Sequence, residues 1–366
     1  MRETYGIDLA ARYLGVDLPH PIGKGSGQLS LNGAQLEDDA AAGLACAVLK
    51  TVIAEDETGA QAMAAWAIHE TRMKVERRAA AGERPGGRTG WTVTWKGRGW
   101  DRSLADYLAL VRTGRDLARA TGMLVVPSVK YHLPRLAEPF RDGEYRHTTR
   151  RLAEAWGEPP LLLEKDFSPT LAGDALSEDR AQIVRWLREV PERIREAAPL
   201  PVRVAVKLMN ARFDDAFQLA MMDAASGADA LVCFNRLFDE REGVAYGGWD
   251  LSDRNLRVLK AFTVRQSDRP TVRLVGTGNV CSGRALLAYA QRGCDSVQLH
   301  TFFQLPLSQF PATHGSRTQR ALHALVFDPR DGLVAGMLEL EAQGKLERRG
   351  GELHFLDVAS DAHRPH

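Results

Sequence analysis

TVRLVGTGNVCSGRALLAYAQRGCDSVQLHTF (271–302) contains the unit from which the fold can be predicted. An apolar run (271–277) leads through a glycine-containing turn into a segment with helical spacing of apolar residues (282–293), and a second apolar run (296–302) follows. Strands of a parallel sheet are apolar throughout because both of their faces are covered, and the helices between them are amphipathic. The stretch therefore predicts a β–α–β unit with two parallel strands.

The same alternation runs through most of the chain. Six further strands are predicted at HPIGKGSG (20–27), ACAVLKTV (45–52), MLVVPSV (123–129), LLLEKDF (161–167), VRVAVKL (202–208) and DALVCFN (229–235), with helices at 103–121, 177–198 and 214–227. Eight strands in this order favour a closed (β/α)₈ TIM barrel over an open sheet. We expect a single domain over residues 1–366, with a barrel core at about 18–328 and a C-terminal extension from about 329 that adds a helix and a hairpin.

Two polar stretches interrupt the alternation, at 73–90 and 134–147. Both are too polar to pack inside the domain, so we predict loops that lie over the C-terminal mouth of the barrel.

Composition excludes several classes of protein. The 366 residues include 48 basic and 47 acidic side chains, for a formal charge of +1, so no overall field favours nucleic acid or an anionic membrane. The four cysteines show no CxxC spacing, which argues against a metal or iron–sulfur site and fits reduced thiols. No apolar run approaches the ~18 residues of a membrane span. We therefore expect a cytoplasmic protein.

Polar residues end many of the predicted strands. They are Ser26, Lys50, Ser128, Lys165, Asp166, Ser168, Lys207 and Asn235. Right-handed crossovers bring the carboxyl ends of all barrel strands to one face, so these side chains should converge on one mouth.

The turn Gly276-Thr277-Gly278 lies between a predicted strand and a predicted helix. Such a turn can present backbone N–H groups and a helix N-terminus to a phosphate. A dinucleotide-binding fingerprint is an alternative interpretation of the same residues, but Cys281 stands where its third glycine belongs and the motif follows seven strands instead of the first.

Six short motifs occur in the order and spacing of one known family. They are the small turn of YLGVDLPHPIGKGSG, the lysine of VLKTV, the lysine of VAVKL, the asparagine that ends GADALVCFN, the glycine pair of YGGWDLS, and LVGTGNVCSGRALLAYAQRGCDSVQLHT. Over roughly residues 12–330 the chain thus resembles the dihydroorotate dehydrogenase family of FMN barrels. The resemblance implies an FMN-binding set of Gly25, Ser26, Lys50, Thr51, Ser128, Lys207, Asn235, Gly247, Gly248, Gly276, Thr277, Gly278, His300 and Thr301.

The chemistry of a flavin is consistent with this set. Hydride delivered to flavin N5 leaves negative charge near N1 and O2, which a fixed ammonium stabilises. Lys207 or Lys50 could fill that role, and Lys50 is also a candidate catalytic residue. Apolar walls for a ring-shaped substrate could come from the strand ends and from WTVTWKGRGW (91–100).

The substrate-binding motif departs from the family pattern. The family's proton acceptor lies in a strand-end segment that here reads KDFSPT (165–170), in which the base position, Ser168, and a proline are kept while two ring-binding asparagines are lost. Tyr131 and His132 are alternative bases. We predict a small cyclic substrate other than dihydroorotate, and the candidate substrate-binding residues are Lys165, Asp166, Thr94, Tyr131 and His132.

Three functions remain open at this point. The first is an FMN-dependent oxidoreductase acting on a C–C bond, with a soluble electron acceptor or donor. The second is dihydroorotate dehydrogenase itself, in pyrimidine metabolism, with a rewired pocket. The third is a barrel without flavin that binds phosphate as an isomerase, aldolase or binding protein. The resemblance also implies a homodimer.

Overall fold

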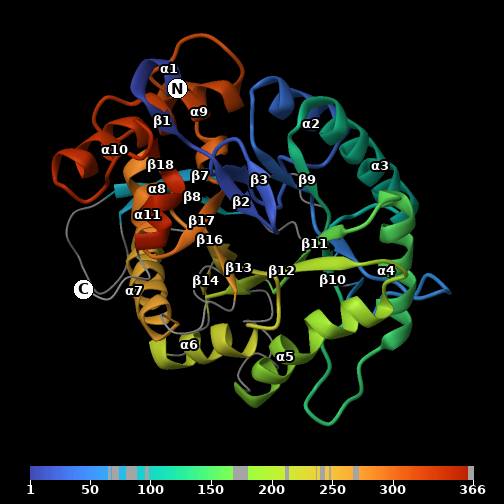
Figure 1. The fold of residues 1–366 in the computed structure, drawn as a ribbon. Coiled ribbons are helices and arrows are strands. Elements are labelled where there is room, and N and C mark those ends of the chain that lie inside the picture. The colour runs from blue at the N-terminus through green and yellow to red at the C-terminus, as the bar shows by residue number, and fades with distance from the viewer. Residues whose placement is uncertain are drawn as a thin grey trace.

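The computed structural model describes residues 1–64, 67, 74–79, 89–94, 99–167, 180–210, 214–235, 237–239, 244–246, 249–266 and 272–361. In these ranges ten strands form one curled, all-parallel sheet in the order β6-β10-β11-β12-β13-β16-β17-β4-β5-β9 (Figure 1). The strands are β4 (Ile22–Lys24), β5 (Cys46–Val48), β6 (Val52–Ile53), β9 (Leu124–Val126), β10 (Ser128–Lys130), β11 (Leu161–Asp166), β12 (Val202–Met209), β13 (Ala230–Asn235), β16 (Arg273–Thr277) and β17 (Cys294–Leu299). All eight predicted strands are found, in a barrel-like α/β fold.

Two of the predicted strands are each divided into two short ones. The run 45–52 gives β5 and β6, and the run 123–129 gives β9 and β10 around Pro127, which has no N–H to donate to a ladder. Both divided runs keep the same neighbour, because β5 pairs with β9 and β6 pairs with β10. The Leu49 N–H also donates to the Val126 carbonyl at 2.9 Å, between the two pairings.

Helices cover the outer face of the sheet in chain order (Figure 1). They are α2 (Gly33–Ala41), α3 (Leu104–Thr121), α4 (Asp142–Trp156), α5 (Arg180–Ala197), α6 (Asp215–Ala224), α7 (Trp249–Arg265), α8 (Gly283–Ala290) and α9 (Arg317–Phe327). Helix α10 (Leu333–Ala342) packs on the outside of α8 and α9. Several start at a capping side chain, as Ser103 and Ser282 show by accepting the backbone N–H three residues on. The main apolar core fills the space between these helices and the sheet.

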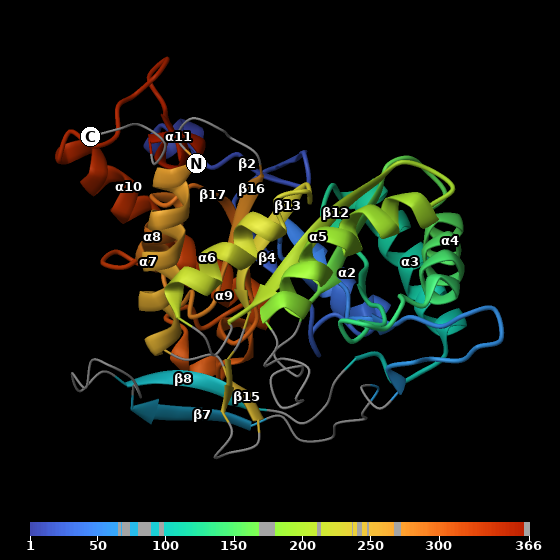
Figure 2. The same ribbon diagram turned by 90° about the horizontal axis from the view of Figure 1, so that it is seen from below.

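The prediction of a loop at 73–90 was wrong for the residues of this stretch that the structure describes, 74–79 and 89–90. Residues 74–79 and 89–94 form an antiparallel hairpin, β7 (Lys74–Ala79) and β8 (Thr89–Thr94). Val75 and Trp91 are partly buried and pack against the core, which gives the hairpin an apolar side despite its polar composition. Figure 2 shows β7 and β8 beside β15 (Val244–Tyr246), which pairs with β14 (Leu237–Asp239).

The second predicted loop, 134–147, is partly helical because α4 begins at Asp142. Buried polar side chains of α4 bind loop backbone: the Glu144 carboxylate accepts the N–H groups of Ala62 (2.6 Å) and His132 (3.1 Å). Thr148 exchanges hydrogen bonds with the backbone of Glu55 in the same way. These polar residues therefore hold two loops in place, and the segment that carries them resembles a loop in sequence.

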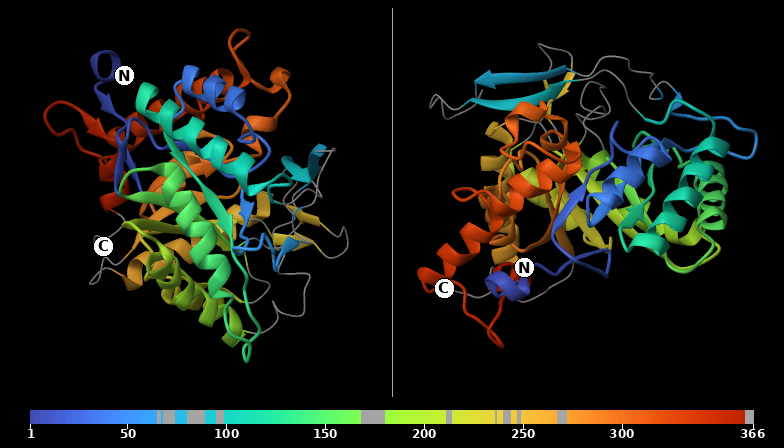
Figure 3. Two further views of the ribbon diagram at one scale, coloured as in Figure 1. Left: turned by 90° about the vertical axis from the view of Figure 1, so that its right-hand side faces the viewer. Right: turned by 90° about the horizontal axis from the view of Figure 1, so that it is seen from above.

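The end of the sheet that is opposite to β7 and β8 carries the first and last parts of the described chain (Figure 3). The elements here are α1 (Arg2–Tyr5), β1 (Ile7–Asp8), the hairpin β2 (Ala11–Tyr13) and β3 (Val16–Leu18), β18 (Leu353–His354) and α11 (Phe355–Asp361). β1 pairs in parallel with β18, and Ser296 of β17 donates to the Arg12 carbonyl of the β2–β3 hairpin. The helix predicted in the extension is present as α10, whereas the predicted hairpin is reduced to one bridge between Arg349 and Glu352.

None of the helices among the described residues is both long and apolar enough to cross a membrane.

Candidate functional site

Three hydroxyl groups from distant parts of the sequence form a chain of hydrogen bonds. Ser26 follows β4, Thr51 lies between β5 and β6, and Ser128 begins β10. The Ser26 and Thr51 oxygens are 2.9 Å apart, and the Thr51 and Ser128 oxygens are 3.0 Å apart. Tyr107 fixes the far end, because its hydroxyl donates to the Ser128 carbonyl and accepts from the Ser128 N–H. The structure thus brings together three residues of the expected FMN set, which we call the hydroxyl chain.

The Lys207 ammonium lies against the turn that contains Ser26. A Cβ built on Gly25 would be 3.4 Å from Lys207 Nζ and 3.4 Å from Gln298 Oε1. Lys207 is 5% exposed, and its Nζ donates to Gln298 Oε1 at 3.4 Å. The predicted lysine of β12 and the predicted turn after β4 are therefore neighbours.

The turn Gly276-Thr277-Gly278 is held rigidly on the next strands of the sheet. The Thr277 hydroxyl donates to the Gln298 carbonyl of β17 (2.8 Å), and the Thr277 carbonyl accepts from Asn255 and Tyr289. Gly278 has φ 99°, a backbone conformation that a side chain disfavours, and its carbonyl accepts from the Tyr289 hydroxyl at 2.8 Å. Helix α8 begins at Gly283, so the turn lies between a strand and a helix as predicted, and its phosphate-binding role stays a prediction.

His300 connects this turn region to the end of β4. A Cβ built on Gly27 would lie 2.0 Å from His300 Nε2, so the imidazole packs directly on the glycine backbone. Gln304 also contacts the imidazole, with its amide nitrogen 2.9 Å from Nδ1 and 3.0 Å from Nε2. Thr301 is the residue that precedes the short 3₁₀ helix Phe302–Gln304. The expected flavin contacts of β4 and β17 are therefore adjacent in space.

A second group of charged and polar side chains comes from β10, β11 and β13. Lys130 Nζ is 3.8 Å from an Asp166 carboxylate oxygen, and the Asn235 amide donates to the other oxygen at 3.4 Å. Asp166 and Asn235 were predicted, and Lys130 was missed because the strand was expected to end at Val129. Alternate residues of a strand share a face, so a strand extended by one residue would have placed Lys130 on the same side as Ser128.

Lys165 and Tyr131, two of the candidate substrate-binding residues, point elsewhere. Lys165 lies between Glu164 and Asp166 and so faces the other side of β11; it is fully buried, donates to the Asp166 carbonyl and lies 4.3 Å from the centre of the Phe167 ring. Burial, and then the charge of Lys130, lowers the pKa of Lys165 to about 7.

The aromatic alternatives for the base lie against α4. Tyr131 is fully buried, its hydroxyl is 2.6 Å from that of Thr149, and its ring stacks on Tyr145. His132 is 9% exposed and pairs with Glu138 at 3.4 Å, and burial lowers its pKa. The partners of the Tyr131 and His132 side chains therefore lie on α4 or just before it, and not in the hydroxyl chain.

The remaining candidates are placed only in part. Lys50 is 7% exposed, and its backbone N–H donates to the Ser30 carbonyl. Thr94 ends β8, where it pairs with Lys74, and its side chain lies outside the described residues, as do Ser168, Gly247 and Gly248. The proton acceptor therefore stays a prediction from sequence.

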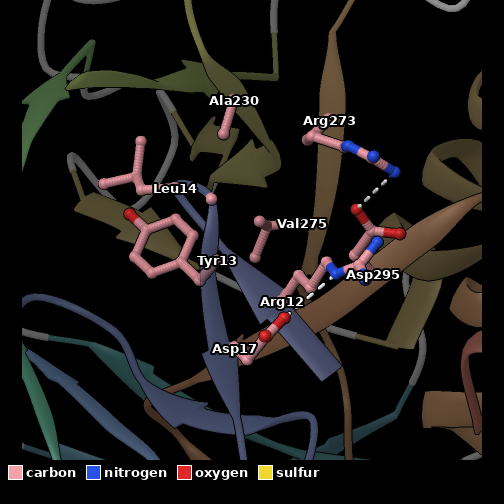
Figure 4. Close-up of a pocket in the computed structure, with 9 residues that line it drawn as sticks. Arg12, Tyr13, Leu14, Asp17, Ala230, Arg273, Val275 and Asp295 are labelled. Carbon is pink, nitrogen blue, oxygen red and sulfur yellow. Dashed lines mark hydrogen bonds and ion pairs between the residues drawn. The ribbon is translucent and has the colours of Figure 1, made fainter. Parts of the chain in front are cut away.

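A cavity of about 330 Å³ lies at the other end of the sheet, beside the β2–β3 hairpin (Figure 4). Two ion pairs lie at its wall, Arg12 with Asp17 (3.1 Å) and Arg273 with Asp295 (3.4 Å). None of the residues predicted for the site lines this cavity, so it is separate from the hydroxyl chain.

A scan against protein-family models and a search of curated proteins found no match for this chain. The case for a function therefore rests on the residues and on their arrangement.

Proposed function

We propose that the chain is a single-domain, closed (β/α)₈ barrel. This count takes β5 with β6 as one strand and β9 with β10 as another, so the ten strands of the sheet become eight. Pairing of β5 with β9 and of β10 with β11 would then close the ring. The carboxyl ends of all eight strands would share one mouth, where barrel enzymes carry their active sites.

We propose further that this mouth binds FMN and that the protein is an FMN-dependent oxidoreductase acting on a C–C bond of a small cyclic substrate. One observation carries the proposal: the hydroxyl chain and the Lys207 ammonium meet at the turn Gly25–Gly27, although they come from four separate parts of the sequence. The resemblance to the dihydroorotate dehydrogenase family assigned these same positions to FMN.

The donor set fits the chemistry of FMN. Hydroxyl groups and an ammonium can bond the polar edge of an isoalloxazine ring, while a rigid glycine turn ahead of α8 can take the phosphate. Lys207 would hold the negative charge that develops at the pyrimidine side of the ring. When bound, FMN would supply the hydride chemistry that the protein's own side chains cannot perform.

The charged group beside this set favours a substrate other than dihydroorotate. Asp166 can accept a hydrogen bond and Lys130 can donate one, whereas the family uses neutral asparagines at its ring-binding positions. Asp166 and Lys130 already pair with each other, and an uncharged dihydropyrimidine amide would complement these two buried charges less well than a charged group would. We therefore propose a ring that carries its own charged or strongly polar substituents, oxidised or reduced with a soluble partner.

The visible absorption spectrum of the purified protein, before and after addition of FMN and dithionite, tests the proposal. We expect flavin bands near ~450 and ~370 nm that bleach on reduction. Lys207→Met should weaken FMN binding by tenfold or more. Lys24→Met is the matched control, because Lys24 is also a buried lysine paired with a carboxylate, that of Asp39, but it lies on the α2 side of β4. A wild-type spectrum that FMN cannot change contradicts the proposal.

Two other functions give different results in the same experiments. Dihydroorotate dehydrogenase proper would bind FMN and turn over dihydroorotate with fumarate, quinone or NAD. A phosphate-binding barrel without flavin would stay colourless yet be stabilised against heat by inorganic phosphate, since Asn255 and Tyr289 hold the turn at Thr277 in place.

A further inference from the structure

A buried carboxylate, that of Glu164, lies beside the Lys207 ammonium. Glu164 of β11 is fully buried, and its Oε1 lies 3.7 Å from Lys207 Nζ. Its Oε2 accepts from the Tyr13 hydroxyl at 3.1 Å and from the Gln298 amide at 2.7 Å. Four elements, β2, β11, β12 and β17, therefore contribute to one polar cluster.

The two oxygens of Glu164 have different environments. Oε2 has two hydrogen-bond donors, whereas Oε1 has no hydrogen-bond partner among the described residues and faces only the Lys207 charge. A carboxylate buried in this way is costly unless a cation compensates it, so it attracts the ammonium and restricts its position.

Tyr13 remains a donor under all ordinary conditions. Burial raises the pKa of the Tyr13 hydroxyl, and the negative charge of Glu164 raises it further. Burial also raises the pKa of the Cys46 thiol, and Glu164 adds to this shift as well. The neighbours of Glu164 are thus neutral donors or thiols, and Lys207 is the one cation paired with it among the described residues.

We infer that Glu164 is a positioning residue for Lys207, fixed by Tyr13 and Gln298, and that it sets the net charge presented to the flavin. This inference rests on the proposed function. The Glu164–Lys207 pair has no net charge, so bound FMN would interact with a balanced pair instead of a lone cation. Reduced flavin carries more negative charge than oxidised flavin, so the balance disfavours reduction relative to a lone cation.

Glu164→Gln tests this directly. The variant keeps the shape of the side chain and its contacts with Tyr13 and Gln298, but leaves the Lys207 charge uncompensated. We expect the affinity for reduced FMN to rise about tenfold relative to oxidised FMN, which raises the two-electron midpoint potential by about 30 mV. Glu164→Asp, which keeps the charge, should stay closer to the wild type.

Asp39→Asn is the matched control. Asp39 and Lys24 form another buried ion pair, with Thr318 as an additional donor to the carboxylate. Loss of this pair should lower stability without moving the potential.

The outcomes separate the two proposals. A wild-type protein that binds no FMN overturns the proposed function and this inference with it. A wild-type protein that binds FMN, together with a Glu164→Gln variant of unchanged potential or an Asp39→Asn variant with the same shift, overturns the inference alone. If Glu164→Gln does not fold, Tyr13→Phe replaces it: loss of one donor leaves the carboxylate less neutralised, so the potential should fall, and no change or a rise contradicts the inference.

Discussion

Replacement of Lys207 by methionine should destabilise the fold even without any ligand. Methionine matches the length of lysine but has no charge, so Glu164 would remain buried with no cation. Removal of one partner of a buried ion pair costs about 3–5 kcal/mol. We expect the lower end of this range, because Tyr13 and Gln298 still donate to Glu164.

The double variant Lys207→Met/Glu164→Gln isolates the electrostatic part of this loss. Neutral glutamine needs no cation, and a buried ion pair replaced on both sides is often nearly neutral in stability. We therefore expect the double variant to recover about 2 kcal/mol relative to Lys207→Met, which is a coupling energy typical of contacting residues.

Equilibrium unfolding in urea at pH 7, followed by tryptophan fluorescence, measures both effects. With a slope of about 3 kcal/mol/M, a loss of 3 kcal/mol lowers the unfolding midpoint by about 1 M. The reasoning is refuted if Lys207→Met unfolds at the wild-type midpoint, or if the double variant is less stable than Lys207→Met.

Three further predictions concern single side chains. Thr51→Val removes the middle group of the hydroxyl chain and should lower the free energy of unfolding by about 1 kcal/mol. It should also weaken FMN binding about tenfold in a fluorescence titration, and unchanged binding contradicts the role of the hydroxyl chain. Lys165→Met should flatten the pH dependence of stability. The pKa of Lys165 is about 7 in the folded protein and ~10.4 in the unfolded chain, so the unfolded state binds more protons between these values. The stability of the wild type therefore rises with pH across that window. A variant whose urea midpoint rises as much as that of the wild type between pH 7 and 9.5 would exclude this. Gly278→Ala places a Cβ only 2.6 Å from the Asn255 amide nitrogen at a residue with positive φ, and should lower the free energy of unfolding by about 1–3 kcal/mol. Gly344→Ala is the control, because Gly344 also has a positive φ but lies in open space, and should cost less. Equal melting temperatures of the two variants would rule out crowding at Gly278.

The alternation of apolar runs was enough to predict the strands of the parallel sheet and most of the polar residues at their ends, although not Lys130. Ser26 and Ser128 were identified by their positions at strand ends and Thr51 by the family resemblance, and the three do share hydrogen bonds. The sequence could not tell which face of a fully buried strand points inward. In LLLEKDF (161–167), Glu164 and Asp166 share one face and Lys165 takes the other, but a strand that is apolar on both faces does not indicate which of these is the interior.

Polar segments were the other source of error. The composition of α4 resembles that of a loop because its buried Glu144 and Thr148 bind loop backbone instead of contributing to an apolar helix face. Such contacts depend on tertiary structure and leave no local periodicity from which they could be predicted.

The pairing of β1 with β18 has a consequence for synthesis of the chain. Ile7 lies opposite Leu353, and the β2–β3 hairpin needs Ser296 before it can attach to the sheet. At the usual 5–20 residues per second, roughly 20–70 s separate the emergence of these partners from the ribosome. During that interval Glu164 and its neighbours stay hydrated, and the interior of the sheet is sealed only when the last strands arrive. Nascent chains should therefore remain sensitive to protease near residue 13 until Leu353 has emerged from the ribosome.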